Sequence, residues 1–599
     1  MAFVSIFAVA LSGIDQATAQ TLQSGDIVSA SVDTANSGPA IKGSFIGFSL
    51  EWGTFKEYSG LASETNPIFA QLLKNVNTGS GPARLRIGGD SSDKRWWNPD
   101  NKPFPPGITV NTQTKDFDNI EAVASQTGSK IVLGLNMAQN VTQYAVDLAK
   151  AALANFPESR IAAFEIGNEA NNYATKPYYT DANGNTVVVR PSGYSSDQYR
   201  KEFGAFSSAL TNQVNNVPSL SALSYAGNAF MEALPTFLAS EANELSICSI
   251  HRGFLANSNK YKLPVTIENL LAESTAHDWA ASQALYVDQC GAYGVGFVLG
   301  DASATGSDAG NGVSNTMAAA LWGTDLAFEL AQTGFSGVNW RAAPNVEFDQ
   351  PFKFTESGGV YTPTINPLYY GIMLFANATA NQARLLPVST TDTGNIKIWA
   401  TKDNQGTTRV VALNKDLNVS GNARIQLAGT SGSATLVRLS APSISAKTGL
   451  TLAGQTFDGT KTGKPVGTYT STSLNSSSGT YVFSLPKGSA AMLTIPSGGA
   501  TVQVGLLLDQ SSYAKGEKMY AQATSTASPT QVKFYLDNKQ VWTEKISPYW
   551  LGGDSNTGST SQATGYSTSG LAVGSHTLKA VSVVNGVSYS SSNIQFQVN

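Results

Sequence analysis

The stretch FEIGNEANNY, residues 164–173, passes from a β-like segment into a group of amides around one carboxylate, Glu169. The residues before it, IAAFEIGN (161–168), have the composition of a buried strand, so Glu169 follows the C-terminal end of that strand. Enzymes built on a barrel of parallel strands carry their catalytic side chains at such strand ends. Whether Glu169 lies in such a barrel depends on the segments to either side of it.

Seven further β-like runs flank this strand, and helix-like segments separate them. The runs are 45–52, 83–89, 130–136, 222–228, 247–251, 294–301 and 335–340. Intervening segments such as VTQYAVDLAKAALANF and NTMAAALWGTDLAFELAQ place apolar residues at helical spacing. Eight βα units predict an α/β fold, a (β/α)8 TIM barrel over residues 41–345, rather than an open doubly wound sheet. A G-x-G-x-x-G turn is missing after the first strand, which also disfavours dinucleotide binding.

Beyond Pro344 the pattern changes to strands alone. Runs such as IKIWATKD, TTRVVALNKD and SAAMLTI are separated by clusters of Gly, Asn, Ser and Thr. They predict an attached β-sandwich over residues 346–497, to which we expect residues 20–40 to add an N-terminal strand. After the short linker PSGGA, residues 501–599 alternate apolar and polar side chains around turn signals. They predict a C-terminal immunoglobulin-like all-β module.

Composition restricts the possible partners. Only 13% of the residues are charged and the formal net charge is −4, so no basic patch for nucleic acid is expected. MAFVSIFAVALSG, with ATAQ shortly behind it, has a signal-like apolar core and an A-x-A site ending at Ala19. We therefore expect residues 1–19 to be a signal peptide of a secreted or periplasmic protein, although its positively charged start is missing. A trimmed start codon and a buried N-terminal segment are the alternatives. No other run has the roughly 18 apolar residues of a membrane helix.

Cysteines and histidines are few. Cys248 and Cys290 allow one disulfide in an oxidising compartment or two buried thiols, and the sequence leaves both open. The three histidines stand at 251, 277 and 576, and none is spaced i to i+4 with another or lies directly beside a cysteine. We therefore expect no metal and no other cofactor.

A catalytic role for Glu169 requires a second carboxylate. Glu165 is about 13 Å from Glu169 along the strand, at roughly 3.3 Å per residue, which is too far for the catalytic partner. It faces the inside of the barrel, so we expect it to form a structural ion pair with Arg86 or Arg84. Asp301 ends the seventh run and lies roughly across the barrel rim from Glu169. Such a pair can hydrolyse glycosides, because one carboxyl protonates the leaving oxygen while the other attacks the anomeric carbon. An apolar site or repulsion from Asp301 is then expected to raise the pKa of Glu169.

The motifs around these acids resemble glycoside hydrolase family 79, the β-glucuronidase and heparanase family of retaining enzymes. The resemblance runs from FIGFSLEWG through RLRIGGDSSD, FEIGNEANNY and GVSNTMAAALWGTDLAFELAQTGFSGVNW to NPLYYGIMLFA. It implies a (β/α)8 barrel with an attached β-sandwich, Glu169 as general acid/base and Asn168 as the amide that holds the sugar 2-hydroxyl. It also implies a carbohydrate partner, and it suggests that Glu51 and Asp90 contact glycone hydroxyls. The alternative for these two acids is a loop-stabilising role.

The chain departs from the family pattern near Asp301. The family reads Gly-Glu where this chain has Gly300-Asp301, and His-Arg-Tyr or a similar triplet where this chain has HRG (251–253). The loop ASATGSDAGNG after Asp301 and the end of strand eight, NWR (339–341), also differ. The shorter aspartate leaves three outcomes open: retention through a glycosyl-Asp301 intermediate, inversion by an intervening water, or loss of catalysis.

Other side chains near the strand ends have candidate roles. We expect His251 to donate to substrate or to Asp301, with a satisfied core histidine as the alternative. Trp340 offers a sugar-stacking face or fills the barrel wall. Arg252 and Arg341 are candidate partners for a uronate carboxylate, or lie on the solvated surface.

The sequence therefore predicts a secreted, exo-acting β-glycosidase of the β-glucuronidase type. It works by retention, with Glu169 as acid then base and Asp301 as nucleophile. The weak overall charge favours an exo pocket over a cleft for a sulfated polymer. A catalytically impaired carbohydrate-binding homologue and a β-glycosidase with a different sugar specificity are the alternatives. Aromatic residues of the C-terminal module suit carbohydrate stacking or a plain immunoglobulin-like core.

Overall fold

The computed structural model describes residues 22–599 except for short internal segments. These exceptions are 158, 258–261, 307–309, 345–347, 392–394, 428–431, 498–503, 526–528, 556–561 and 585–586. The predicted signal segment, 1–19, lies outside the described residues, as does most of the linker PSGGA. The chain divides into two compact units, Met1–Ile495 and Pro496–Asn599, each of which is described by itself.

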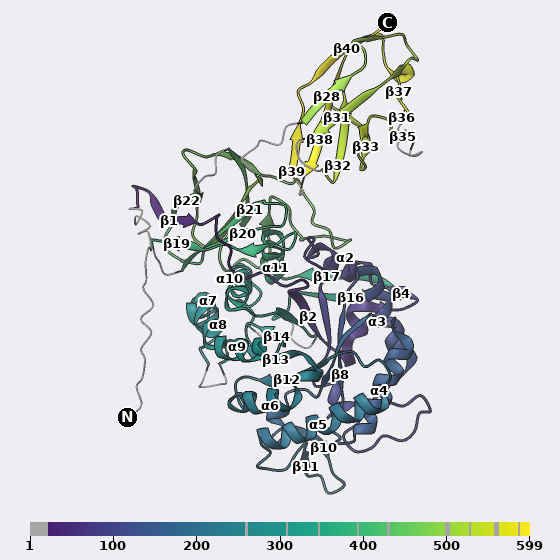
Figure 1. The fold of residues 1–599 in the computed structure, drawn as a ribbon, viewed down its shortest axis with the longest axis vertical. Helices are drawn as coiled ribbons and strands as arrows, with labels where there is room; N and C mark the ends of the chain where they lie inside the picture. Colours follow the sequence, from purple (N-terminus) through teal and green to yellow (C-terminus); the bar gives the residue numbers. More distant parts are fainter. Residues whose placement is uncertain are drawn as a thin grey trace, which may run out of the picture. The chain divides into compact units, whose positions relative to one another are not determined.

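Eight parallel strands of the first unit close into a barrel (Figure 1). They are β2 (Ile46–Glu51), β5 (Arg84–Gly88), β8 (Ile131–Leu135), β9 (Ile161–Ile166), β12 (Leu220–Ala226), β13 (Leu245–Gly253), β14 (Gly296–Ser303) and β15 (Gly337–Ala342). The order around the barrel follows the sequence, and β9 pairs with β12. Each strand coincides with one of the eight predicted runs. The predicted (β/α)8 barrel is therefore confirmed.

Helices cover the outside of this barrel (Figure 1). They include α1 (Phe55–Ser59), α2 (Pro67–Asn75), α3 (Thr114–Thr127), α4 (Thr142–Asn155), α5 (Ser196–Gln213), α6 (Leu234–Glu241), α7 (Ile267–Leu271), α8 (His277–Ser282), α9 (Ala284–Ala292), α10 (Met317–Thr333) and α11 (Pro367–Ala378). Local sequence sets their starts: Asn66 caps α2 ahead of Pro67, and Ser195 caps α5 in a capping box with Gln198. Helix α10 is buried almost all round because it packs against α11 as well as the barrel.

Two sheets beyond the barrel form the attached β-structure of the first unit. One sheet has the order β19 (Val388–Thr390), β1 (Asp26–Val32), β22 (Gly421–Leu427) and β26 (Thr480–Leu485). The other contains β18 (Arg384–Leu385), β20 (Ile396–Lys402), β21 (Thr408–Asn414), β27 (Ser489–Ile495), β23 (Ser433–Ser440) and β24 (Thr451–Leu452), and β25 (Thr472–Asn475) pairs with β23. Their facing side chains form a separate apolar core. The N-terminal strand β1 lies within this structure, parallel to β22.

The second unit is all-β and has its own core. Its larger sheet contains β29 (Ser512–Tyr513), β40 (Ile594–Val598), β38 (Gly574–Val584), β32 (Gln531–Leu536) and β33 (Lys539–Glu544), with β39 (Val587–Ser590) paired to β38. A smaller sheet contains β28 (Val504–Leu508), β31 (Ala521–Ser525) and β34 (Tyr549–Trp550). Lys579 lies over the Tyr535 ring, and the Trp542 indole donates to Glu544.

The two cysteines lie next to each other behind the barrel wall. Cys248 in β13 and Cys290 in α9 are both buried free thiols, and the Cys248 thiol is hydrogen-bonded to Cys290. Of the two states that the sequence left open, the structure therefore has the thiols. Among the described residues, no helix has both the length and the apolar character that crossing a membrane requires.

Candidate active site

A cavity of about 430 Å³ lies at the C-terminal ends of the barrel strands. Its lining includes six of the seven predicted site residues: Glu51, Asp90, Asn168, Glu169, His251 and Asp301. They come from the ends of β2, β5, β9, β13 and β14 or from the turns that follow. The seventh, Trp340, does not line the cavity.

Strand register decides which side chains face this cavity. In the strand pairing His251 lies opposite Asp301, and Arg341 lies opposite Ser49. Ser49 in turn lies opposite Arg86. Register neighbours in a sheet share a face, and the Ser49 hydroxyl and Arg86 guanidinium meet inside the barrel. These five side chains therefore form an inward-facing belt around the mouth of the barrel.

The prediction that Trp340 stacks on a sugar is wrong. Trp340 is in register with Ala302 and Phe48, one residue out of phase with the inward belt. Its ring is fully buried outside the barrel wall, with its centroid 5.8 Å from that of Trp322 in α10. It fills the space between barrel and helix, which was the alternative role. Arg252 is also in register with Ala302, but unlike Trp340 its side chain lines the cavity.

Glu169 is held at the cavity by its backbone and by a histidine. Its φ of 52° is in the left-handed region, which is uncommon for a residue with a side chain, and its N–H donates to Ser224 O over 2.9 Å. His251 Nδ1 lies 3.1 Å from Glu169 Oε1. The partner of His251 is thus Glu169, and not Asp301 as one sequence expectation had it.

The expectation that the pKa of Glu169 is raised is also wrong. Burial raises this pKa, but the hydrogen bond from His251 and the positive charges of Lys176 and Arg86 outweigh burial and lower it below its ordinary value. Among the described residues, the buried Nε2 of His251 has no hydrogen-bond partner. His251, Lys176 and Arg86 therefore favour the ionised form of Glu169.

Asp301 is held from below by a hydroxyl and an arginine. Its Oδ2 accepts from Ser49 Oγ over 3.0 Å and lies 3.8 Å from Arg86 Nη1. The fully buried Arg86 also pairs with Glu165 over 2.5–3.2 Å and donates to Asn168 Oδ1 over 2.7 Å. The predicted ion pair between Glu165 and Arg86 is confirmed. Sequence reasoning missed Ser49, whose signal is its place two residues before Glu51 on the same face of β2.

A second polar group supports the rim beside Asn168. Asn168 Nδ2 donates to Asp90 Oδ1 over 2.9 Å, and Lys176 Nζ lies 2.6 Å from the same oxygen. Glu51 accepts hydrogen bonds from Asp90 N, Ser91 N and Ser91 Oγ over 2.7–3.2 Å. Glu51 therefore borders the cavity and also stabilises the turn after β5.

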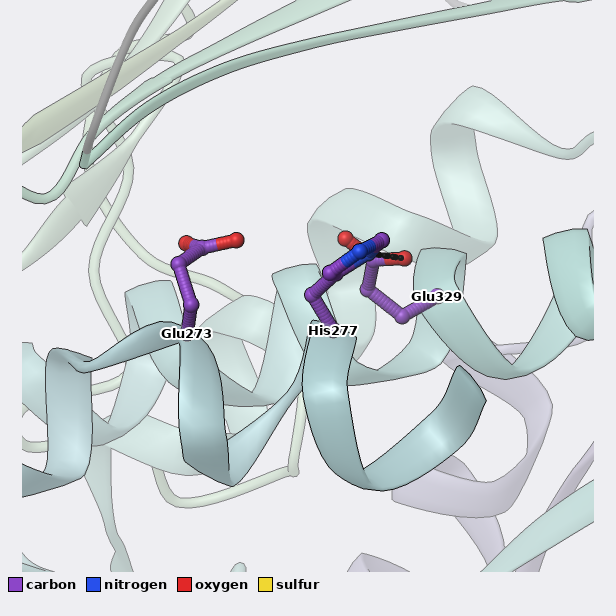
Figure 2. A group of neighbouring side chains, drawn as sticks. All are labelled: Glu273, His277 and Glu329. Carbon is purple, nitrogen blue, oxygen red and sulfur yellow. Dashed lines mark hydrogen bonds and ion pairs between the residues drawn. The ribbon is translucent and has the colours of Figure 1, made fainter. Parts of the chain in front are cut away.

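One group outside the cavity has the chemistry of metal ligands. The ligand atoms of Glu273, His277 and Glu329 lie within 4.8 Å of one another (Figure 2). However, Lys397 pairs with both glutamates, Lys415 pairs with the other oxygen of Glu273, and His277 binds Glu329. A metal ion would have to displace two ammonium groups from these carboxylates. The arrangement is that of an ion-pair network between α10 and the attached sheets.

Comparisons with known proteins support the resemblance seen in the motifs. Residues 397–492 match a family model described as the glycosyl hydrolase family 79 C-terminal beta domain. A β-glucuronidase of Aspergillus niger is 23% identical over 331 residues, which are 51% of this chain and 59% of the relative. A β-glucuronidase of Neurospora crassa is 24% identical over 354 residues, which are 54% of this chain and 61% of the relative. The chain thus spans about three fifths of the length of these relatives, and its resemblance to family 79 is confirmed.

Solved structures share the fold at lower identity. A 4-O-α-L-rhamnosyl-β-D-glucuronidase from Fusarium oxysporum 12S is 18% identical with a TM-score of 0.61, covering 78% of this chain and 100% of that chain. A family 51 arabinofuranosidase from Xanthomonas axonopodis pv. citri is 14% identical with a TM-score of 0.53, covering 78% of this chain and 99% of that chain. Both solved structures are similar to this chain in fold.

Proposed function

We propose that the chain is a secreted, exo-acting β-glycosidase of the β-glucuronidase type that works with retention. In this proposal the Asp301 carboxylate attacks the anomeric carbon while Glu169 gives its proton to the leaving oxygen. Glu169 then takes a proton from the water that hydrolyses the glycosyl-Asp301 ester. The observation that carries the proposal is that both carboxylates border one cavity, from β9 and β14, and each has its own supporting partners. The relatives named β-glucuronidase support the choice of sugar.

The amide of Asn168 is set up for a hydroxyl contact. Arg86 holds its oxygen and Asp90 accepts one of its N–H groups, so the orientation of the amide is fixed. The second N–H then serves the sugar 2-hydroxyl, a contact that strengthens in the transition state of glycoside hydrolysis. Asp90 and Glu51 on the same rim are the proposed acceptors for other glycone hydroxyls.

Glu169 must gain a proton before it can act as an acid. Binding of an anionic sugar brings a like charge near Glu169 and removes water from the cavity, and both effects raise its pKa. The lowered pKa of Glu169 is therefore compatible with general acid catalysis once substrate is bound. It also means that activity should fall as the pH rises through the pKa of Glu169.

Replacing His251 by alanine is expected to shift that fall to higher pH. The variant loses the hydrogen bond that favours the ionised carboxylate, while the burial that raises the pKa of Glu169 remains. A hydrogen bond to a charged group contributes about 1.5 kcal/mol, which corresponds to about one pH unit. The measurement is the pH profile of kcat/KM. His277→Ala is the matched control, because His277 makes a similar 3.1 Å contact with Glu329 away from the cavity. An unshifted profile in His251→Ala contradicts this role.

The proposed activity is tested with four aryl substrates. The β-glucuronide is compared with the β-glucoside, the β-galactoside and the β-xyloside, and the anomer first released from each substrate that is turned over is identified by NMR. We expect turnover of the glucuronide with retention. Release of the opposite anomer means that a water enters between Asp301 and the sugar. No turnover of any of the four removes the glycosidase proposal.

A carbohydrate-binding protein without catalysis is the second candidate. Two observations favour it: aspartate stands where the resemblance implies glutamate, and the pKa of Glu169 is lowered by its neighbours. Such a protein would bind the glycone in the same cavity and release it unchanged.

Lengthening Asp301 to glutamate separates the two candidates. Ser49 and Arg86 already support the shorter side chain, so an added methylene moves the carboxylate away from its hydrogen-bond donor. A misplacement of about 1 Å can cost 10²-fold in rate, and we expect a loss of about that size in kcat/KM. Ser49→Ala is the companion variant and should lower the rate in the same direction. A gain of activity in Asp301→Glu would instead show that the lost methylene had inactivated the site.

A further inference from the structure

One cation of the inward belt lies among the acids of the candidate site. Arg341 of β15 borders the cavity and is in register with Ser49, the residue that supports Asp301. Burial lowers the pKa of Arg341, but the charges of Asp301, Asp349, Glu51 and Glu169 outweigh burial and raise it. Arg341 is therefore permanently charged and close to both candidate catalytic carboxylates.

Most N–H donors of the Arg341 guanidinium have no acceptor among the described residues. In the part of the chain that the structure describes, Arg341 forms no salt bridge within 4 Å and makes one hydrogen bond, from Nη1 to Gly306 O over 3.0 Å. A guanidinium has five N–H donors in a planar fork that matches the two oxygens of a carboxylate. The side chain thus has unused capacity for an anionic ligand that enters the cavity.

The contact with Gly306 also fixes where the fork points. The loop Ala304, Thr305 and Gly306 follows β14, and the buried Asp349 accepts from the backbone N–H of all three residues over 2.9–3.1 Å. Its carboxylate accepts from the Thr305 hydroxyl as well. A loop held in this way is a rigid acceptor for Arg341, and it pre-organises the guanidinium before substrate arrives.

Two of the other cations near the site are already paired. Arg86 is paired with Glu165, and Lys176 is paired with Asp90 and Asp93. Arg252, an equal candidate in the sequence, also lines the cavity, but its register is that of the outward-facing row and its guanidinium lies 5.8 Å from the Phe254 ring. Arg252 and Lys262 are therefore the rivals of Arg341.

We propose that Arg341 binds the carboxylate of a hexuronic acid in the glycone position and so sets the preference for acidic over neutral sugars. This inference rests on the proposed function and names the residue that reads the charged group of the substrate. The cavity also holds four carboxylates, Glu51, Asp90, Glu169 and Asp301, which would repel a uronate without a local cation. Arg341 supplies that cation on the strand next to Asp301.

The test compares acidic and neutral sugars in one variant. Arg341→Met keeps much of the length of the side chain and removes its charge and donors. We expect kcat/KM for an aryl β-glucuronide to fall by about 10- to 100-fold, the equivalent of one charge-assisted contact, mainly through KM. Hydrolysis of the matching β-glucoside should change by less than about threefold, because it has no carboxylate to lose. Arg252→Met tests the second arginine that lines the cavity, and its acid preference should persist.

A binding measurement keeps the inference testable in an inactive protein. Titration calorimetry of Glu169→Gln with free D-glucuronate and D-glucose should show a preference for glucuronate that Arg341→Met abolishes in the same background. Equal losses of kcat/KM for the glucuronide and the glucoside in Arg341→Met would mean that Arg341 supports Asp301 rather than the substrate. That result would contradict the inference. The inference is also contradicted if Lys262→Met or Arg252→Met, and not Arg341→Met, removes the preference. If glucuronide is hydrolysed equally well by Arg341→Met, the proposed function stands without this inference. A wild type that neither hydrolyses nor binds uronates removes both.

Discussion

Replacing Glu169 by glutamine is expected to lower kcat/KM for an aryl β-glucuronide by roughly 10²- to 10⁴-fold. Glutamine has nearly the same shape and still accepts the hydrogen bond from His251, but it can neither donate an acidic proton nor accept one from water. The loss should be largest for substrates whose leaving group is strongly basic, because those need the proton most. Steady-state kinetics over a series of aryl glucuronides with leaving groups of different basicity measures this.

The control for this prediction is an equally small change at another carboxylate. Glu121 pairs with Arg160 on the outside of the barrel, and Glu121→Gln should leave kcat/KM within about twofold of wild type. Circular dichroism should show that both variants are folded. If Glu169→Gln keeps wild-type activity on every leaving group, Glu169 is not the general acid.

The barrel could be predicted because its signal is repeated and local. Each strand is a short run rich in apolar residues, and in IVLGL of β8 every residue is buried between the barrel core and the helices. The strand ends were also visible, because polar residues such as Asn168 and Asp301 follow or end apolar runs. Six of the predicted site residues therefore lie around one cavity.

The wrong prediction for Trp340, that it stacks on a sugar, has a specific geometric cause. Which of two neighbouring residues faces the lumen depends on register, and the pairing of β14 with its neighbours is irregular between Ile250 and His251 and again between Leu299 and Ala302. A shift of one residue exchanges the two faces of a strand. Such irregularities come from tertiary packing and leave no mark in the periodicity of one strand.

The pKa of Glu169 was mispredicted because its partners come from other parts of the chain. His251 belongs to β13, and Arg86 belongs to β5. Sequence reasoning considered burial and Asp301, both of which raise the pKa. It did not include the three groups whose combined effect lowers it.

Replacing Lys415 by methionine is expected to lower the free energy of unfolding of the first unit by about 3–5 kcal/mol. The Lys415 side chain is only 1% exposed, and its Nζ lies 2.7 Å from Asp325 and 2.8 Å from Glu273. Asp325 lies on α10 and is itself fully buried. Without the ammonium, the indole N–H of Trp399 is the one hydrogen-bond donor left to this carboxylate among the described residues. Urea denaturation of wild type and variant, followed by fluorescence, measures the change.

A matched substitution and a compensating substitution test whether loss of the ion pair causes the loss of stability in Lys415→Met. Lys447 is exposed and makes one hydrogen bond to Asn311, so Lys447→Met should change stability by no more than about 0.5 kcal/mol. Adding Asp325→Asn to Lys415→Met removes the uncompensated charge and should recover part of the loss. Burial lowers the pKa of Lys415, but Asp325 and Glu273 raise it above its ordinary value. The stabilisation is therefore present at neutral pH and disappears only as the pH rises through that raised pKa. A loss in Lys415→Met no larger than in Lys447→Met would mean that apolar packing alone joins α10 to the attached sheets.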